Sequence, residues 1–437
     1  MATSMTSVTS VQKHVLENGL TVLLKPLHHT PIVNWRVLYR VGSRNEQTGQ
    51  TGISHWVEHM LFKGTPQFPA GTLDRLIDRE GGYWNAHTFI DFTAYFETLP
   101  ADRIDLALRI EADRMVNALF EPEEVESERT VIISERQGNE NSPLFWLGEE
   151  VSAAAFRVHP YGHEIIGDMA DLQTITRDDL YGHYRRYYMP NNAIAVAVGD
   201  FEPQAMLERI EALYGSIPAG QPPPPVTRWE PEQVGERRVR VEREGQTAFI
   251  KVAYKAPAAS DPDWFKLAVL ESVLAGPSGM GGGSVGNKTS RLYRALVLSE
   301  LAADVQASLI PTVDPYLLEF DVTVREGHTH EEVEAALDAE LARVRSEPIS
   351  QAELEKAIKQ ARALFAYSTE GVSGQSFWLA FSENFDSYAW FETYVDRLSA
   401  VTVADVQEAA EKYLSPRRRT VGWYVPTGAG NGEGATA

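Results

Sequence analysis

The chain has 437 residues, a formal net charge of -21 and no cysteine. The lack of cysteine excludes disulfides, zinc-thiolate sites and thiol catalysis. The acidic balance argues against nucleic acid and anionic membranes as partners. A chain this long, 43% hydrophobic, can bury sizeable cores and is expected to form two or more domains.

The sequence contains no membrane or export signal of the usual kinds. It has no run of 18 or more apolar residues, so we expect no membrane span. The opening stretch, MATSMTSVTSVQKH, shows neither the apolar core of a signal peptide nor an Arg-rich amphipathic pattern. We therefore expect a cytoplasmic protein, while a mature periplasmic form that has lost its leader stays open.

The first half alternates between strand and helix patterns. An Asn-Gly pair within residues 15–25 predicts a hairpin turn, and residues 32–41 predict a second strand. A helix is expected in the stretch 52–65, which follows a glycine-containing loop. Further on we expect a short helix at 73–79, a strand or hairpin at 83–99, helices at 102–119, 122–137 and 178–188, and a buried strand at 193–198.

Residues 55–59 read His-Trp-Val-Glu-His. On a helix, His55 and His59 lie on one face, one turn apart, and can take two corners of a zinc tetrahedron. Glu58 projects beside the same site, where a carboxylate can take a proton from an attacking water. The order His-x-x-Glu-His is the inverse of the commoner zinc-protease motif. The plainer alternative is a helix face on which these residues occur by chance.

A proline-rich stretch at 218–231, PAGQPPPPVTRWEP, predicts an extended spacer and a domain boundary. Beyond it the pattern begins again, and one constant offset relates the matching positions at both ends of each half. The matching pairs are Gly19 and Gly245, Thr21 and Thr247, Thr176 and Thr402, Asp179 and Asp405, Tyr187 and Tyr413, and Pro190 and Pro416. We interpret this as a duplication.

The predicted fold is therefore α+β, with two tandem homologous domains. Each is expected to be a mostly antiparallel sheet with flanking helices. The predicted boundaries are a metal-bearing catalytic domain at 11–217, a linker at 218–232, a domain without metal at 233–427 and a flexible tail at 428–437.

The second half has no His-x-x-Glu-His. In the second half, the position equivalent to His55 by the same offset is Gly281, which lies in the glycine-rich stretch 276–290. This stretch lacks the spacing of a phosphate-binding loop, so we predict no nucleotide site. It is either a flexible loop over the site or a plain surface linker.

A zinc hydrolase needs a third protein ligand and an open position for water. The helix predicted at 122–137 places Glu124, Glu128 and Glu135 close to one face. Any one of these glutamates, considered by itself, also fits a solvated amphipathic helix.

Together these pieces resemble the pitrilysin, insulin-degrading enzyme and mitochondrial processing peptidase family of inverted zincins, in its bacterial metal-bearing form. The resemblance extends to HMLFKGT (59–65), GGYWNAHTFIDFTAYF (81–96), YGHEIIGD (161–168), YYMPNNAIAVAVGDF (187–201) and SRLY (290–293). The family places a ligand Glu well downstream of the motif, and Glu135 stands at the matching distance from His59.

The resemblance assigns roles to individual residues. It implies that His55, His59 and Glu135 hold Zn2+, that Glu58 is the general base, and that Glu128 orients a ligand histidine. It also implies that substrate adds to an edge strand at Asn85 and Ala86. His87 is expected to be a neighbour on that strand rather than a fourth ligand.

One departure from the family concerns the second half. Complete members carry an Arg and a Tyr shortly after the SRLY-like segment, and these hold the substrate carbonyl. Here Val297 stands at the Arg position, Asp304 falls near the Tyr position, and Arg294 comes too early in the chain. We therefore expect a heterodimer in which a homologous subunit without the motif supplies the missing pair.

The expected function is a zinc endopeptidase acting on peptides or unfolded segments. The alternatives are a non-catalytic core or scaffold subunit of the same fold, and a presequence-type processor that favours basic substrates.

Overall fold

The structure is a computed structural model that describes residues 10–279 and 287–428. Gly281 and the predicted tail from residue 429 onward lie outside the described residues. The chain forms two compact units, each assembled from three segments. Unit 1 comprises the chain up to Glu135, Glu164–Thr227 and Thr369–Phe391; unit 2 comprises Arg136–His163, Arg228–Ser368 and the chain from Glu392 onward.

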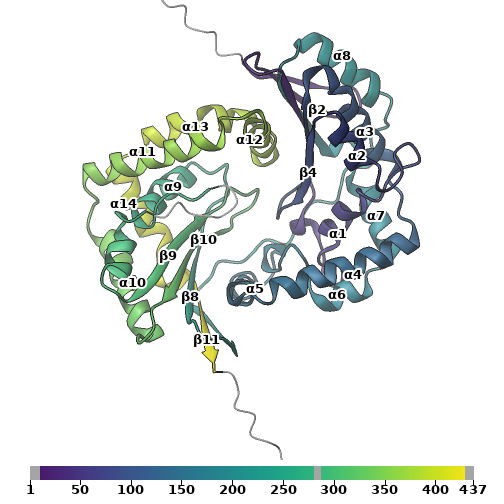
Figure 1. The fold of residues 1–437 in the computed structure, drawn as a ribbon. Helices are drawn as coiled ribbons and strands as arrows, with labels where there is room; N and C mark the ends of the chain where they lie inside the picture. Colours follow the sequence, from purple (N-terminus) through teal and green to yellow (C-terminus); the bar gives the residue numbers. More distant parts are fainter. Residues whose placement is uncertain (1–9, 280–286, 429–437) are drawn as a thin grey trace, which may run out of the picture. The chain divides into compact units, whose positions relative to one another are not determined.

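Unit 1 contains a six-stranded sheet, drawn in purple to blue-green in Figure 1. Strands β2 and β6 are parallel, and the other neighbours are antiparallel. The order is β1 (Gln12–Val15), β2 (Thr21–Pro26), β6 (Ala193–Gly199), β3 (Ile32–Tyr39), β5 (Thr93–Pro100) and β4 (Tyr83–Thr88). Strand β4 is therefore an edge strand, and it forms the predicted hairpin with β5.

Unit 2 contains a five-stranded sheet of matching topology. Its order is β7 (Arg237–Glu244), β11 (Arg419–Thr427), β8 (Phe249–Lys255), β10 (Leu317–Val324) and β9 (Ala302–Leu309). Strands β7 and β11 are parallel, as β2 and β6 are, and the other pairs are antiparallel. Apart from the additional β1, the two sheets have the same strand order. The predicted α+β duplication is confirmed.

The carboxyl-terminal parts of the two repeats match in detail. Helices α7 (Arg177–Tyr187) and α14 (Val403–Tyr413) both begin with a capping box. In each, a Thr hydroxyl accepts from the N–H of an Asp three residues on, and that carboxylate accepts from the Thr N–H. The helices are followed by β6 and β11, which are equivalent strands.

The amino-terminal pairs of the sequence comparison are wrong as structural equivalents. Gly19 precedes β2, whereas Gly245 follows β7, and the sheet order equates β2 with β7. The same applies to Thr21 and Thr247. Tight turns between strands reuse glycine followed by a strand-forming residue, so a short match can join two different turns.

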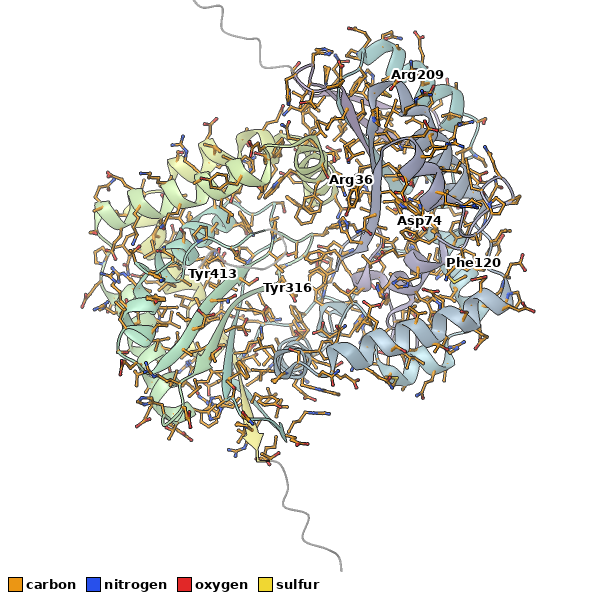
Figure 2. All side chains as sticks on the ribbon, viewed as in Figure 1. Arg36, Asp74, Phe120, Arg209, Tyr316 and Tyr413 are labelled. Carbon is orange, nitrogen blue, oxygen red and sulfur yellow. The ribbon has the colours of Figure 1, made fainter. Side chains whose placement is uncertain are left out.

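Helices cover both faces of the unit 1 sheet. Helices α3 (Asp105–Asn117) and α8 (Pro203–Tyr214) pack on one face, as Figure 1 shows. Helix α12 (Val372–Phe385), far along the chain, packs on β3 and β6. Arg36 of β3, labelled in Figure 2, is buried and donates from Nε to Ser376 Oγ of α12 at 3.2 Å. The first sheet is thus completed by a helix from the second repeat.

Unit 2 contains the reciprocal arrangement. Helix α5 (Pro143–Ala155), from the first repeat, packs on β7, β8 and β11. A Cβ placed on Gly422 of β11 would lie 2.4 Å from Val151 Cγ2 and 2.7 Å from Leu147 Cδ1. The glycine therefore allows α5 to approach the strand closely. Helices α9 (Asp263–Leu274) and α11 (Gln351–Ser368) also pack against each other in this unit.

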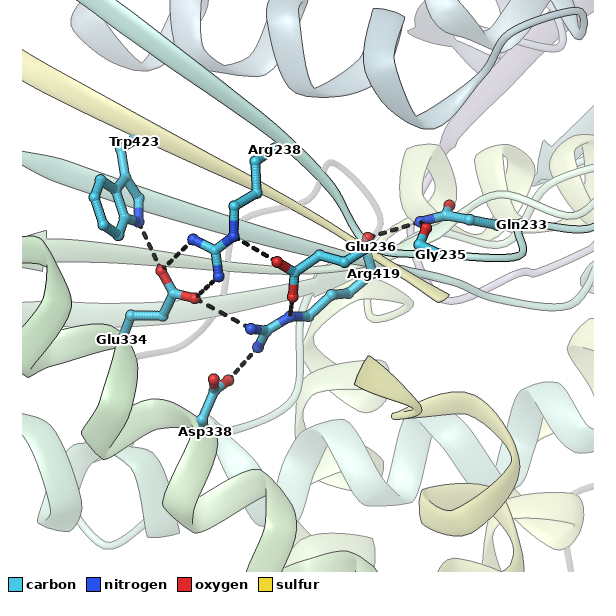
Figure 3. Close-up of polar contacts among 8 residues, drawn as sticks. All are labelled: Gln233, Gly235, Glu236, Arg238, Glu334, Asp338, Arg419 and Trp423. Atoms are coloured by element: carbon cyan, nitrogen blue, oxygen red, sulfur yellow. Dashed lines mark hydrogen bonds and ion pairs between the residues drawn. The ribbon is translucent and has the colours of Figure 1, made fainter. Parts of the chain in front are cut away.

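A charged network joins the strands of unit 2 to helix α10 (His330–Ser346), as Figure 3 shows. Glu334 accepts from Arg238 Nη1 at 3.0 Å, from Arg419 Nη2 at 3.1 Å and from Trp423 Nε1 at 2.8 Å. Gln233, just after the proline-rich stretch, donates to the Arg419 carbonyl at 2.7 Å. These contacts fasten the end of that stretch to the sheet.

The remaining helices are α1 (Ile53–Met60), α2 (Leu73–Arg79), α4 (Pro122–Asn139), α6 (Met169–Thr174) and α13 (Tyr388–Ala400). The helices predicted at 73–79, 122–137 and 178–188 are confirmed, with ends that differ by no more than a residue or two. Within the described residues, 10–279 and 287–428, no helix is both long and apolar enough to cross a bilayer.

Candidate metal centre

The histidine pair of the motif lies on α1, whose start is held by two contacts. Gly52, the residue before the helix, has φ +85°, and a Cβ there would lie 2.4 Å from the Ile166 carbonyl oxygen. The buried Glu46 carboxylate accepts from the N–H groups of Gly52 at 2.8 Å and Ser54 at 2.9 Å. An anion at a helix amino terminus is favoured by the unpaired N–H groups and the helix dipole.

The structure brings His55, His59 and Glu135 together. The two Nε2 atoms are 3.2 Å apart, and Glu135 Oε2 of α4 lies 3.8 Å from each. Bonds of about 2.0–2.2 Å to a tetrahedral ion give ligand separations of about 3.3–3.6 Å. The donor set and its spacing therefore fit a metal ion.

His59 is oriented by a row of charged side chains. Glu128 Oε1 lies 2.8 Å from His59 Nδ1, and Glu128 Oε2 forms an ion pair of 2.5 Å with Lys63 Nζ. Burial acts to lower the pKa of His59, but the Glu128 hydrogen bond and the nearby carboxylates raise it overall. The Glu128 contact fixes the ring so that Nε2 faces His55 Nε2 and Glu135 Oε2.

His55 has a different environment. Burial, together with the neighbouring His59, lowers its pKa to about 3, so the imidazole is neutral and its Nε2 lone pair can bind a metal. Its Nδ1 atom is buried and has no hydrogen-bond partner among the described residues.

Glu58 is buried, with 7% of its surface exposed, and is close enough to His59 and Glu135 to interact with both electrostatically. Burial raises the pKa of its carboxyl, and a hydrogen bond from Thr88 opposes this change. Thr88 Oγ1, at the end of β4, donates to Glu58 Oε2 at 2.7 Å. A carboxylate held beside a metal position is well placed to accept a proton from a water.

Strand β4 presents different residues to its two faces. Ala86 and Thr88 lie on the face toward α1, whereas Asn85 and His87 lie on the face toward α12. The His87 ring is 5.7 Å from the Phe377 ring of α12, so His87 is not part of the metal cluster. The side-chain oxygen of Asn85 accepts the N–H of Ala86 at 2.8 Å, so this edge donor is already occupied.

An aromatic pair lies near the site on the α1 face of the sheet. The rings of Phe62 and Trp84 are 4.7 Å apart, and Trp84 Nε1 donates to the Asp74 carboxylate, labelled in Figure 2, at 2.9 Å. Below them Arg114 is fully buried and pairs with Glu97 at 3.3 Å and with Glu111. Arg114 Cζ lies 5.6 Å from the centroid of the Trp84 ring, so this buried ion pair packs against the α1 face of β4.

Sequence reasoning missed Glu46, Lys63 and Thr88. Strand alternation places Thr88 on the same face as Ala86, which was a usable signal. Glu46 lies in a loop ahead of α1, and no local pattern connects it with that helix.

Comparisons with known proteins identify the family of this chain. Residues 21–169 match the family described as Insulinase (Peptidase family M16), and residues 174–361 match the Peptidase M16 inactive domain. Zinc protease PqqE of Helicobacter pylori (strain ATCC 700392 / 26695) is 30% identical over 437 residues, covering 98% of this chain and 96% of that protein. This chain belongs to peptidase family M16.

Two other similarities support the same membership. The beta subunit of the mitochondrial-processing peptidase of Lentinula edodes is 27% identical, covering 91% of this chain and 86% of that protein. The crystal structure of a protease from Helicobacter pylori superposes on this M16 chain with a TM-score of 0.90 at 29% identity. The superposition covers 96% of this chain and 100% of the Helicobacter pylori chain.

Proposed function

We propose that this M16 protein is a zinc-dependent endopeptidase that hydrolyses peptides or extended, unfolded segments. The observation that supports this most directly is the convergence of His55, His59 and Glu135, with Glu58 beside them. Three protein ligands, one open position and an adjacent carboxylate are what metal-assisted hydrolysis of a peptide bond requires.

In this proposal His55, His59 and Glu135 hold the zinc, which supplies Lewis-acid polarisation of the peptide carbonyl and activation of water when it is bound. Glu58 accepts the proton of the attacking water and donates it to the leaving amine. Glu128 keeps the His59 ring in the ligating orientation through its 2.8 Å contact.

Substrate binds along the β4 edge as an additional strand, with Asn85 and Ala86 making the first contacts. Main-chain pairing of this kind needs no strict side-chain sequence, which suits a general peptidase. Because Asn85 Oδ1 occupies the Ala86 N–H, its amide must rotate away before a substrate carbonyl can accept from that donor.

The proposal includes a partner of the same fold. This part rests on the family resemblance, in which Val297 and Asp304 stand at or near the positions of the expected Arg and Tyr. Val297 ends a π-helical turn at Tyr293–Val297, and Asp304 lies on β9. A homologous subunit would supply the Arg and Tyr, and a homodimer would not. One relative is named as a beta subunit.

A non-catalytic scaffold role is the second candidate, because residues 174–361 match a model described as an inactive domain. The metal cluster lies outside that range, between residues 55 and 135. The intact cluster and its base favour the peptidase.

The test is hydrolysis of a quenched peptide by the zinc-loaded chain, together with its metal content, in the wild type and in Glu58→Gln. We expect one zinc per chain in both proteins and a loss of activity of at least about 100-fold in the variant. A wild type that binds no zinc would refute the proposal. Basic and acidic peptides, compared side by side, test whether the enzyme prefers basic substrates.

The partner is tested by the same assay at increasing dilution. If a second subunit is needed, the chain by itself has low activity, and adding the homologous subunit raises it. Full activity of the isolated chain at high dilution contradicts the heterodimer.

A further inference from the structure

We propose that Thr88 is a positioning residue for Glu58: its hydroxyl holds the general base in place before and after proton transfer. This inference rests on the proposed function. Thr88 ends β4 directly opposite Thr93 of β5, beside the tight turn closed by the Phe89 N–H and the Phe92 carbonyl at 2.7 Å. Its backbone is therefore fixed by the hairpin.

The hydroxyl of Thr88 has two neighbours. Its Oγ1 lies 2.7 Å from Glu58 Oε2 and 3.3 Å from Thr93 Oγ1. The Thr93 hydroxyl donates to the Val41 carbonyl at 2.9 Å, which uses its single proton and leaves its oxygen available as an acceptor. Thr93 is fully buried, so this orientation does not depend on solvent.

A count of protons shows what this arrangement does. While Glu58 is a carboxylate, it can only accept, and Thr88 donates to it. Because Oε2 is the oxygen that accepts from Thr88, the proton of the attacking water adds to the other oxygen, Oε1, and Oε2 of the neutral acid still accepts from Thr88. The hydrogen bond between Glu58 and Thr88 persists in both states without movement of either side chain.

The burial of Glu58 makes this contact important. A buried carboxylate without a donor is costly, and it relieves the cost by rotating toward water or toward another donor. Among the described residues, Thr88 is the side chain that hydrogen-bonds to Glu58. The Thr88 N–H also hydrogen-bonds to this carboxylate, so the hydroxyl is the second of two Thr88 groups that fix its direction.

The experiment compares Thr88→Val with Thr88→Ser in the zinc-loaded protein. Valine keeps the shape and the strand preference but removes the hydroxyl, whereas serine keeps the hydroxyl. We expect Thr88→Val to lower kcat by about 10- to 100-fold, with KM changed less than about threefold and zinc content unchanged. Thr88→Ser should stay within about threefold of the wild type in both constants.

A second readout does not depend on activity. Crystal structures of the zinc-loaded wild type and Thr88→Val should show one Glu58 rotamer in the first and a displaced or divided Glu58 in the second. The inference is overturned if Thr88→Val retains wild-type kcat, if Thr88→Ser loses as much as Thr88→Val, or if Glu58 keeps the same single rotamer in both crystals. A wild type that binds zinc but cleaves no peptide would count against the proposed function, and the crystal comparison would still decide the role of Thr88.

Discussion

At the scale of single residues, the row formed by Lys63, Glu128 and His59 shows how charge outside the His55, His59 and Glu135 cluster orients one of its histidines. The Lys63 ammonium and the His59 ring are both within 2.8 Å of the Glu128 carboxylate. Burial acts to raise the pKa of Glu128, but these two contacts lower it overall. Glu128 therefore stays ionised and holds the His59 Nδ1 proton.

Replacing Glu128 should weaken metal binding. We expect Glu128→Gln to lower zinc affinity by about 10- to 100-fold, because a neutral amide holds the imidazole less firmly than a carboxylate. Competition with a chromophoric chelator measures the affinity. Glu124→Gln is the matched control: Glu124 lies 3.8 Å from the same Lys63, contacts neither histidine and should leave the affinity unchanged. If both variants lost zinc affinity equally, the effect would come from the removal of a negative charge and not from the contact between Glu128 and His59.

A second residue, the buried Glu271 of α9, leads us to predict that the stability of unit 2 depends on pH. Burial raises its pKa to about 8, despite hydrogen bonds from Ser278 and from the Leu309 N–H. The unfolded carboxyl has a pKa near 4.5. Between these values the folded state holds a proton that the unfolded state has released, so stability falls as pH rises from about 5 to about 8.

The variant Glu271→Gln should remove this dependence. A neutral amide resembles the protonated acid at every pH, so the variant should gain on the order of 2–4 kcal/mol relative to the wild type between pH 5 and 8. Urea unfolding across this range, followed by tryptophan fluorescence, measures the difference. Parallel pH curves for the two proteins would contradict a raised pKa at Glu271.

At the scale of elements, close packing of α5 on β11 depends on the absence of a side chain at Gly422. A Cβ there would lie well inside the contact distance of Val151 and Leu147. Gly182, in the interior of α7, has open space around its Cβ position. The same substitution should therefore have opposite effects at the two sites.

Gly422→Ala should destabilise the protein by roughly 1–3 kcal/mol, because the packed Val151 and Leu147 side chains must move to admit a methyl group. Gly182→Ala should stabilise it by up to about 1 kcal/mol, because alanine is the better helix former. Comparing the urea midpoint of each variant with that of the wild type shows whether its stability falls or rises. A neutral Gly422→Ala would mean that α5 is not held tightly on the strand.

Local patterns predicted the elements whose signal lies within the segment. The sequence pattern predicted helices at 122–137 and 178–188, and the structure contains α4 and α7 there. The convergence of Glu135 with the histidines was expected from the resemblance, and the structure brings the three together. The contact of Glu46 with α1 depends on loop geometry, which periodicity does not describe.

At the scale of the whole molecule, the sequence did not reveal which repeat supplies the helices that cover each sheet. An apolar helix face such as that of α12 indicates burial but not against which strands. Phe377 and Phe381 of α12 pack on Phe92 of unit 1, with ring centroids 6.3 and 5.3 Å apart, although the two segments belong to different repeats. The compact units are therefore interleaved, although the repeats are consecutive.

This interleaving predicts the behaviour of fragments. A fragment of residues 1–231 contains all six strands of the first sheet but lacks α12, so it exposes the apolar face around Phe92 and leaves Arg36 without its Ser376 partner. Burying each large aromatic side chain contributes about 1.5–3 kcal/mol. The free energy lost when this face stays exposed is therefore comparable with the whole stability of a domain. We expect this fragment to aggregate when it is expressed by itself.

Co-expression with residues 232–437 should restore a soluble complex, because that fragment carries α12 and in turn needs α5 from the first. Co-purification on a tag placed on one fragment, followed by size exclusion, measures the association. Cleaving the folded chain within 219–226 is the control, and it should leave the two pieces associated. A soluble, cooperatively unfolding 1–231 fragment would show that the first sheet does not need α12. In that case the consecutive repeats, rather than the interleaved units, would be the folding units.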